Sequence, residues 1–274
     1  MRLGAVLFLR TDIEANRYGI GAKVLDWARR VEAAEFDGIW VPDSIGRGYP
    51  TLDPLALLSA FSAVTDKVEL GAAVLQVPLR APVELAYRVQ SLNALAHGRL
   101  RLGVGAGSTQ ADFKLVGADF PHRFRTLTQS LETMRTLWRG EPVNGASLPG
   151  WPDVAPPPVF LGAWRMPHWI AYAAEQCQGW IASGLYSSWA DLESGLRLFR
   201  KFGGKRAILA NVPVDLRDNA GVTSEMRDAP ISLVCDPESA RERLMRIGQL
   251  GFDDVLLIVP PHLTDQLESI RGLL

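Results

Sequence analysis

Short apolar runs alternate with longer amphipathic runs from one end of this chain to the other. The short runs are rich in aliphatic and β-branched residues, which is typical of strands that are buried on both faces of a sheet. The predicted strands are 3–9, 38–41, 68–77, 100–104, 159–162, 180–183, 207–213 and 254–259. The predicted helices are 22–34, 54–63, 82–96, 123–139, 168–176, 190–202, 237–250 and 263–273.

Two of the predicted helices carry a chemical start signal. Asp53-Pro54 and Asp236-Pro237 each pair an N-cap acceptor with a proline at the first helical position, where the missing N–H costs nothing. Eight strands, each followed by a helix, predict a parallel sheet that helices cover. The order of elements is therefore typical of an α/β fold.

Closure of such a sheet gives a (β/α)8 TIM barrel, which needs roughly 250 residues. The chain has 274 residues, so we expect a near-minimal barrel that forms a single domain over residues 1–274. The alternative is a doubly wound open sheet. We interpret residues 140–158, after the fourth helix, as a short surface connection. Residues 215–234 depart from the alternation, and we expect a loop there with one short strand-like run at 231–234.

The composition excludes several classes of protein. Hydrophobic residues make up 47% of the chain and charged residues 22%, with a net charge of −1, so no field would attract nucleic acid or an anionic membrane. No apolar run approaches the roughly 20 residues of a membrane span. The first apolar run is too short for a signal peptide. Cys177 and Cys235 have no metal-like spacing. We expect a cytoplasmic protein.

Barrels of this kind hold their active sites at the C-terminal ends of the strands. The positions concerned are 8–11, 42–44, 75–79, 105–109, 162–166 and 183–186. They contain few acids, bases or nucleophiles and no cluster of metal ligands, which suits an enzyme whose cofactor carries the chemistry. The candidate cofactor-binding residues from this rule are Phe8, Asp43, Leu75, Gly105 and Ser183.

The stretch 102–108 contains three glycines, Gly103, Gly105 and Gly107, after a predicted strand. It lacks the GxGxxG spacing of a dinucleotide fingerprint, and no helix is expected directly after it. The missing Cβ atoms would let a planar ring approach the barrel mouth, or would allow tight packing within the protein.

A second stretch, 160–168, leads from a strand into a helix near Pro167. Free N–H groups at a helix start, with Gly162 and Arg165 nearby, are suited to binding a phosphate. The alternative is an ordinary turn with a surface arginine.

The succession of these blocks resembles the bacterial luciferase-like superfamily. The resemblance lies in residues 35–43 (EFDGIWVPD), 53–58 (DPLALL), 68–75 (VELGAAVL), 97–108 (HGRLRLGVGAGS) and 158–163 (PVFLGA). Asp112-Phe113, Arg123 and Glu132 follow at the expected distances. The resemblance covers most of the chain and implies a (β/α)8 barrel that binds FMN or the deazaflavin coenzyme F420. It also implies a homodimer, which in this family commonly packs through the helices at 54–63 and 82–96.

The resemblance assigns roles to particular residues. Ala73-Val74 aligns with the non-prolyl cis pair that backs the isoalloxazine ring. The phosphate loop would comprise Gly162, Ala163, Trp164, Arg165 and Met166.

The catalytic candidates are Ser44 and Ser108. Ser44 follows Asp43 where many relatives read Asp-His. Ser108 occupies a position at which deazaflavin-dependent sugar-phosphate dehydrogenases carry an acid. Both departures remove an acid–base group, so that particular dehydrogenase chemistry is not expected.

The first functional hypothesis is a flavin-dependent monooxygenase that uses reduced FMN and O2 on an organic small-molecule substrate, with a separate flavin reductase as partner. The second is a deazaflavin-dependent hydride transferase on the same barrel. The third is a barrel that binds flavin without catalysis. The short connection at 140–158 bears on the first hypothesis, because family monooxygenases often insert a longer segment there.

Overall fold

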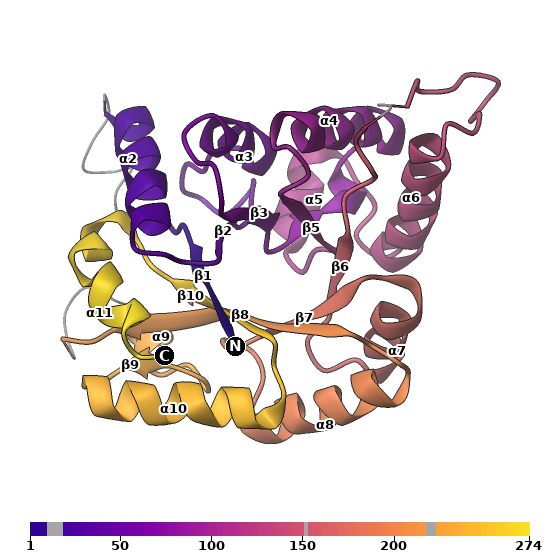
Figure 1. Cartoon of the computed structure of the whole chain (residues 1–274). Coiled ribbons are helices and arrows are strands. Elements are labelled where there is room, and N and C mark those ends of the chain that lie inside the picture. Colours follow the sequence, from indigo (N-terminus) through magenta and orange to yellow (C-terminus); the bar gives the residue numbers. More distant parts are fainter. Residues whose placement is uncertain (10–18, 151–152, 218–222) are drawn as a thin grey trace.

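The computed structural model describes residues 1–9, 19–150, 153–217 and 223–274 of the chain, and strands alternate with helices throughout (Figure 1). The strands are β1 (Arg2–Val6), β2 (Gly38–Val41), β3 (Glu69–Ala72), β4 (Leu75–Gln76), β5 (Leu100–Gly105), β6 (Val159–Gly162), β7 (Gly179–Ser183), β8 (Arg206–Asp215), β9 (Leu233–Val234) and β10 (Asp254–Ile258). The α-helices are α2 (Ile20–Ala33), α3 (Pro54–Ser62), α4 (Pro82–Leu95), α5 (Gln110–Val116), α6 (Arg123–Trp138), α7 (Pro167–Gln176), α8 (Trp189–Lys201), α9 (Ser224–Arg227), α10 (Pro237–Leu250) and α11 (Leu267–Arg271).

The sheet closes on itself. Strand β10 pairs in parallel with β1 on one side and with β8 on the other. The remaining neighbours follow chain order from β1 through β2, β3, β5, β6 and β7 to β8, all in parallel. This closed parallel barrel with helices outside confirms the predicted (β/α)8 fold and excludes the doubly wound open sheet (Figure 1).

Both predicted helix starts are confirmed. The side chain of Asp53 accepts a hydrogen bond from the N–H of Ala56 at 3.0 Å, and Asp236 accepts one from Ser239 at 3.0 Å. Each aspartate satisfies an N–H that the first helical turn leaves without a partner.

The third predicted strand, 68–77, is not continuous. Strand β3 ends at Ala72, β4 covers only residues 75–76, and a 3₁₀ turn follows at Val77–Leu79. The peptide bond between Ala73 and Val74, which lies in the break, is cis. This confirms the cis pair that the family resemblance predicts.

Four other predictions need correction. The short helix α5 begins at Gln110, directly after the glycine-rich stretch, where no helix was expected. The region 215–234 contains α9 and a strand of only two residues, β9; its residues 218–222 lie outside the described ranges. The last predicted helix, 263–273, is a 3₁₀ turn (Pro261–Gln266) followed by α11. The first strand ends at Val6 rather than at residue 9.

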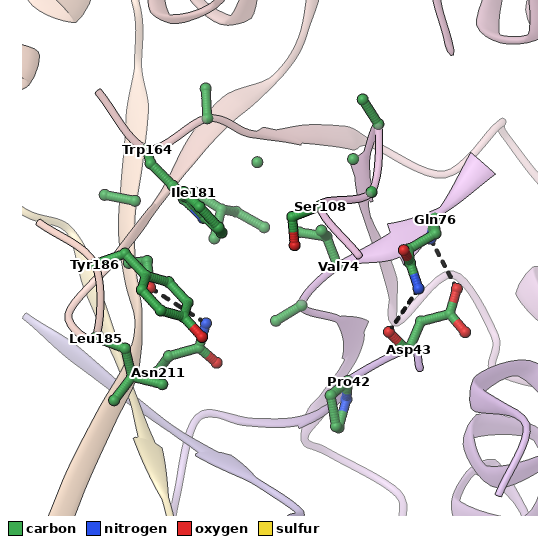
Figure 2. A pocket seen from close by; sticks show the side chains of 18 of the residues that line it. Pro42, Asp43, Val74, Gln76, Ser108, Trp164, Ile181, Leu185, Tyr186 and Asn211 are labelled. Atoms are coloured by element: carbon green, nitrogen blue, oxygen red, sulfur yellow. Dashed lines mark hydrogen bonds between the residues drawn. The ribbon is translucent and has the colours of Figure 1, made fainter. Parts of the chain in front are cut away.

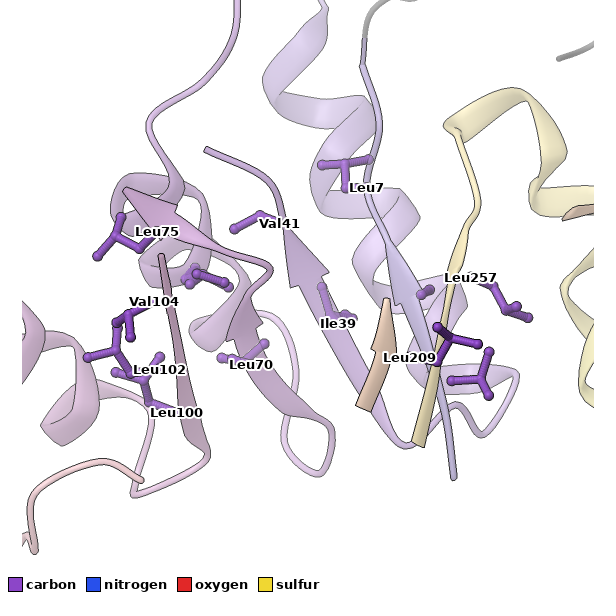
Figure 3. Packing of buried hydrophobic residues seen from close by; sticks show 14 of the residues in the cluster. Leu7, Ile39, Val41, Leu70, Leu75, Leu100, Leu102, Val104, Leu209 and Leu257 are labelled. Atoms are coloured by element: carbon purple, nitrogen blue, oxygen red, sulfur yellow. The ribbon is translucent and has the colours of Figure 1, made fainter. Parts of the chain in front are cut away.

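Two apolar clusters fill the molecule. The larger lies between the barrel and its helices and includes Leu70, Leu102 and Leu209 (Figure 3). The smaller includes Trp40, whose ring takes the space beside a glycine on the next strand. A Cβ at Gly71 would stand 2.2 Å from the Trp40 ring, so only glycine fits there.

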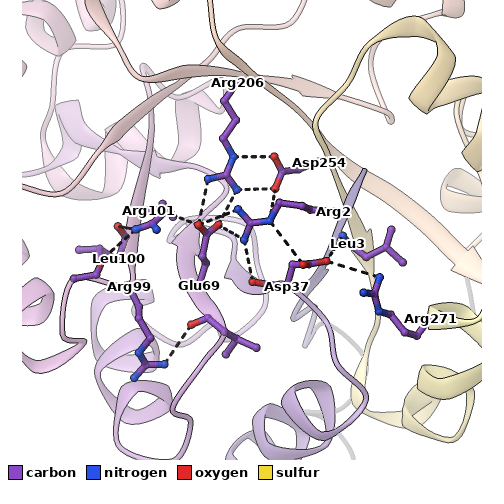
Figure 4. A network of polar contacts seen from close by, with 12 residues as sticks. Arg2, Leu3, Asp37, Glu69, Arg99, Leu100, Arg101, Arg206, Asp254 and Arg271 are labelled. Carbon is purple, nitrogen blue, oxygen red and sulfur yellow. Dashed lines mark hydrogen bonds and ion pairs between the residues drawn. The ribbon is translucent and has the colours of Figure 1, made fainter. Parts of the chain in front are cut away.

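At the N-terminal ends of the barrel strands, a network of charged side chains joins one strand to another (Figure 4). The buried carboxylate of Glu69 on β3 accepts hydrogen bonds from Arg101 on β5 at 2.7 Å and from Arg206 on β8 at 2.7 Å. It also pairs with Arg2 on β1 at 2.9 Å, and Arg206 binds Asp254 on β10. Burial raises the pKa of Glu69, but the hydrogen bonds and charges of the three arginines outweigh this and hold it below its usual value.

None of the helices in the described ranges has the length and apolar character that a membrane crossing requires. The homodimer stays a prediction. The leucines of α3, such as Leu57 and Leu58, are buried in the core, so the large apolar side chains exposed on the predicted dimer helices are Val83, Tyr87 and Leu95 of α4.

We predict that Glu69→Gln lowers the free energy of unfolding by about 3–5 kcal/mol, because it leaves three partly buried arginines without their shared carboxylate. Guanidinium chloride unfolding measures the loss. A group with a lowered pKa stabilises the fold above its unfolded pKa, so the difference between the two proteins should shrink as the pH falls below about 4.

The matched control is Glu193→Gln, since Glu193 forms an exposed pair with Arg197 on α8. That substitution should cost less than about 0.5 kcal/mol. Equal losses in the two variants would show that the network does not hold the barrel together.

Candidate functional site

A cavity of about 750 Å³ opens at the C-terminal ends of the barrel strands. Its volume lies within the range of roughly 300–1,000 Å³ that is usual for sites of small molecules and cofactors. Most of the predicted site residues line it: Phe8, Asp43, Ala73, Val74, Gly105, Ser108, Gly162, Ala163, Trp164, Arg165, Met166 and Ser183. Figure 2 shows how several of these side chains surround the open space.

The structure does not bring two of the predicted residues to this cavity. Ser44 is not among the residues that line it, and its backbone carbonyl accepts a hydrogen bond from Thr51. Leu75 is fully buried in the cluster between barrel and helices (Figure 3). Thr11, at the end of the predicted range 8–11, lies outside the described residues.

The side chain of Val74 explains two of the glycines at the mouth. A Cβ at Gly105 would stand 2.6 Å from Cγ2 of Val74, and a Cβ at Gly162 would stand 2.9 Å from its Cγ1. The space that these glycines leave is therefore taken by Val74 itself. At Gly103 it is taken by the carbonyl oxygen of Ala72, 1.9 Å from where a Cβ would be. Of the two interpretations of this stretch, tight packing within the protein is the one that the geometry supports.

Asp43 is held in a buried ion pair. Its carboxylate accepts hydrogen bonds from Arg80 at 2.6 and 3.0 Å and from the N–H of Gln76 at 2.8 Å. Burial on its own would lower the pKa of Arg80, but the hydrogen bonds and charge of Asp43, with those of Asp53, outweigh it and raise the pKa. Asp43 therefore positions the loops that follow β2 and β4 rather than acting as a free acid.

Gln76 links Asp43 to a second buried carboxylate. Its Nε2 donates to the backbone carbonyl of Asp43 at 3.0 Å and to Asp112 at 2.9 Å (Figure 2 shows the contacts to Asp43). Asp112 is fully buried and also accepts from the N–H of Gly46. The other amide atom, Oε1 of Gln76, is buried without a hydrogen-bond partner in the described part of the protein. A buried acceptor of this kind is suited to a ligand N–H.

The predicted phosphate loop connects the end of β6 to the start of α7. Met166 is the N-cap of α7 and Pro167 its first residue. Arg165 lines the cavity and forms no ion pair with any described residue. Beside it, the ring of Trp164 lies 4.5 Å from that of Tyr186, a residue that follows β7. A free guanidinium and a helix start at one edge of the cavity are suited to an anionic group.

Asn211 is a cavity residue that the sequence analysis missed. Two residues of β8, Ala210 and Asn211, face one residue of β10, because Leu209 pairs with Val255 and Val212 with Leu257. Asn211 takes the left-handed conformation in this bulge, with φ of 57°, and its amide lies 3.5 Å from the hydroxyl of Ser183 (Figure 2). The bulge turns the amide into the cavity. No periodic pattern in the sequence marks it.

Among the described residues, two carboxylates, three arginines and two tyrosines line the cavity. None of the four histidines lines it, and within the described ranges no group of three His, Cys, Asp or Glu side chains is arranged to hold a metal ion. Of its two carboxylates, Asp43 is paired with Arg80, whereas Glu225 on α9 forms no ion pair with a described residue. Glu225 was also missed, because it falls in a region that the sequence analysis interpreted as a loop.

We predict that Asn211→Gly keeps the stability of the fold, because glycine adopts positive φ without cost. Asn211→Val should be less stable than the glycine variant by about 1–2 kcal/mol, since a β-branched residue is strained in this conformation. Urea unfolding compares the two. A valine variant as stable as the glycine variant would mean that the bulge is not needed.

Comparison with known proteins agrees with this geometry. A family model described as luciferase-like monooxygenase matches residues 1–220. An uncharacterized protein of Mycobacterium tuberculosis is 28% identical over 224 residues, which are 78% of this chain and 72% of that protein. An F420-dependent glucose-6-phosphate dehydrogenase of Amycolatopsis mediterranei is 28% identical over 145 residues, 50% of this chain and 44% of that enzyme.

Solved structures share the whole fold at low sequence identity. The monooxygenase RslO1 from Streptomyces bottropensis has a TM-score of 0.84 at 18% identity, covering 100% of this chain and 97% of that chain. An F420-dependent secondary alcohol dehydrogenase has a TM-score of 0.80 at 16% identity, with coverages of 100% and 98%. The FMN complex of a type II Baeyer-Villiger monooxygenase from Pseudomonas putida has a TM-score of 0.79 at 14% identity, with coverages of 100% and 95%. The chain belongs to the luciferase-like monooxygenase family, whose members are oxidoreductases that use FMN or the deazaflavin coenzyme F420.

Proposed function

We propose that this protein is a deazaflavin-dependent oxidoreductase that transfers hydride between the coenzyme and an organic substrate. The observation that supports this choice is the position of the connection between α6 and β6. The described residues of this connection, 139–150 and 153–158, are not among those that line the cavity. The connection lies instead along α4, where Gln90 donates to the carbonyl of Pro149 and Asn93 to that of Ala155. An oxygenating flavin has to be shielded from water, whereas hydride transfer to a deazaflavin has no oxygen-bearing species to protect.

The cavity residues suit a ring with a phosphate-bearing side chain. The ring would lie against the backbone of Ala73 and Val74, and the unpaired Oε1 of Gln76 is placed to accept from an N–H on the polar edge of such a ring. The phosphate would bind at residues 162–166, beside Arg165. When bound, the coenzyme would supply or accept the hydride, and the protein contributes orientation and hydrogen bonds.

The polar side chains around the open space would orient the substrate. The hydroxyl of Ser108 and the amide of Asn211 can donate to a substrate oxygen, and the Glu225 carboxylate can take or return its proton. In the oxidative direction, the substrate carbon loses a hydride and its hydroxyl loses a proton. The reductive direction returns both.

A monooxygenase that uses reduced FMN, supplied by a separate flavin reductase, is the second candidate. The phosphate loop fits this candidate as well, because Arg165, which forms no ion pair with a described residue, could bind the one phosphate group of FMN. Binding of either coenzyme without turnover would instead support a barrel that binds flavin without catalysis.

We predict saturable binding of F420 that is tighter than that of FMN. Both ligands would quench tryptophan fluorescence, because Trp164 and Trp169 line the cavity. Titration of the purified protein with each ligand gives the two dissociation constants. Tighter binding of FMN, together with oxygen uptake in the presence of a reductase and reduced FMN, would favour the monooxygenase.

Arg165→Ala should weaken the binding of phosphate-bearing ligands by about 1.5–3 kcal/mol, or roughly ten- to a hundredfold. The same titration with riboflavin or its deaza analogue, which lack the phosphate, should show no such change. The control variant is Arg197→Ala, which removes an arginine from the exposed side of α8. If ligands with and without phosphate were weakened equally, Arg165 would not contact the phosphate.

A further inference from the structure

A second cleft, of about 360 Å³, lies between α9, α10 and the start of α8. The residues that define it are Trp189, Arg227, Asp228, Ser232, Arg243 and Arg246. Three arginines and one aspartate make it a local positive region on a chain whose net charge is −1. We call it the arginine cleft.

Two of the arginines contact neighbouring groups that carry no negative charge. Arg243 donates to the backbone carbonyl of Ser232 at 2.6 Å. The guanidinium of Arg246 lies 4.0 Å from the ring centroid of Trp189. Within the described ranges, neither they nor Arg227 forms an ion pair, in contrast to Arg2, Arg80 or Arg206. Ordered guanidinium groups without carboxylates are suited to a bound anion.

The arginine cleft adjoins the main cavity along two segments. Tyr186 lines the cavity and Trp189, three residues later, lines the cleft. Met226 lines the cavity and the next residue, Arg227, lines the cleft. Three residues of extended chain span about 10 Å. A ligand that left the cavity at this edge would therefore meet the arginines after a short distance.

The predicted phosphate loop, residues 162–166, lies at this same edge of the cavity. Tyr186 contacts Trp164, which precedes Arg165. Hydrogen bonds from Ser188 lower the pKa of Asp191, in the first turn of α8, and the charge of Arg165 lowers it further. Tyr186, which Trp164 contacts, lies three residues before Trp189, the first residue of α8. The predicted phosphate loop and the arginine cleft follow one another along the surface.

We propose that the arginine cleft binds carboxylate groups of the cofactor that extend beyond its phosphate. The inference rests on the proposed function, because FMN ends at its phosphate whereas F420 continues into a chain of glutamyl carboxylates. Guanidinium groups match carboxylates in charge and in planar geometry. The arginines are exposed to solvent, so each pair contributes little alone and the total is sensitive to salt.

The experiment compares three ligands on wild-type protein and on the double variant Arg243→Gln/Arg246→Gln. The ligands are F420 with its glutamyl tail, the same deazaflavin phosphate without glutamates, and FMN. We expect the variant to bind tailed F420 about two- to thirtyfold more weakly and the other two ligands as the wild type does. Raising the sodium chloride concentration should narrow the difference between the proteins.

The control is Arg29→Gln/Arg197→Gln, which removes two exposed arginines from α2 and α8 outside both clefts. It should leave all three dissociation constants unchanged. Circular dichroism checks that both variants fold.

The outcomes separate this inference from the proposed function. If wild-type protein binds FMN but neither deazaflavin, the proposed function fails and the inference falls with it. If both deazaflavins bind equally well, or the arginine variant weakens tailed and tail-free ligands alike, only the inference is overturned. It is also overturned if the variant keeps every cofactor affinity and raises KM for an anionic substrate, since the carboxylates would then belong to the substrate.

Discussion

The closure of the barrel is the constraint on which the rest of the structure depends. Because β10 pairs with both β1 and β8 in parallel, all strands that form the barrel end at the same rim. Residues as distant in sequence as Phe8, Val74 and Asn211 thereby reach one cavity. At the opposite end the carboxylate of Glu69 draws together arginines of β1, β5 and β8. This charged network and the cavity therefore lie at opposite ends of the barrel.

Much of this arrangement could be predicted from the sequence. The alternation of apolar and amphipathic runs indicated the barrel, and Asp53-Pro54 and Asp236-Pro237 marked two helix starts correctly. The rule that sites lie at strand ends placed most cofactor candidates at the cavity. These features depend on neighbouring residues or on the repetition of one strand–helix unit. They can therefore be predicted from the pattern of residues along the chain.

The remaining features depend on contacts between distant segments. Asp43 was predicted as a cofactor-binding residue, and its ion pair with Arg80, 37 residues away in the sequence, was not foreseen. The glycines of the stretch 102–108 suggested room for a ring, but Val74 fills that space at Gly105 and the carbonyl of Ala72 fills it at Gly103. The bulge at Asn211 arises from the register between β8 and β10, and its sequence signal is a single asparagine in an otherwise regular strand. Pairing and register of this kind are set by the closed barrel and not by any one segment.

The position of the free charges bears on how the site could distinguish its cofactors. FMN and a deazaflavin present similar flat rings and one phosphate, so contacts of the ring with Val74 and Gln76 offer little with which to discriminate between them. A group that only one ligand carries offers a larger difference in affinity. Arg165 and the arginines of the arginine cleft have no carboxylate partner among the described residues, and they lie at the edge where the phosphate would leave the cavity. Selectivity would then arise outside the ring site, where a few surface substitutions can change it without disturbing the barrel.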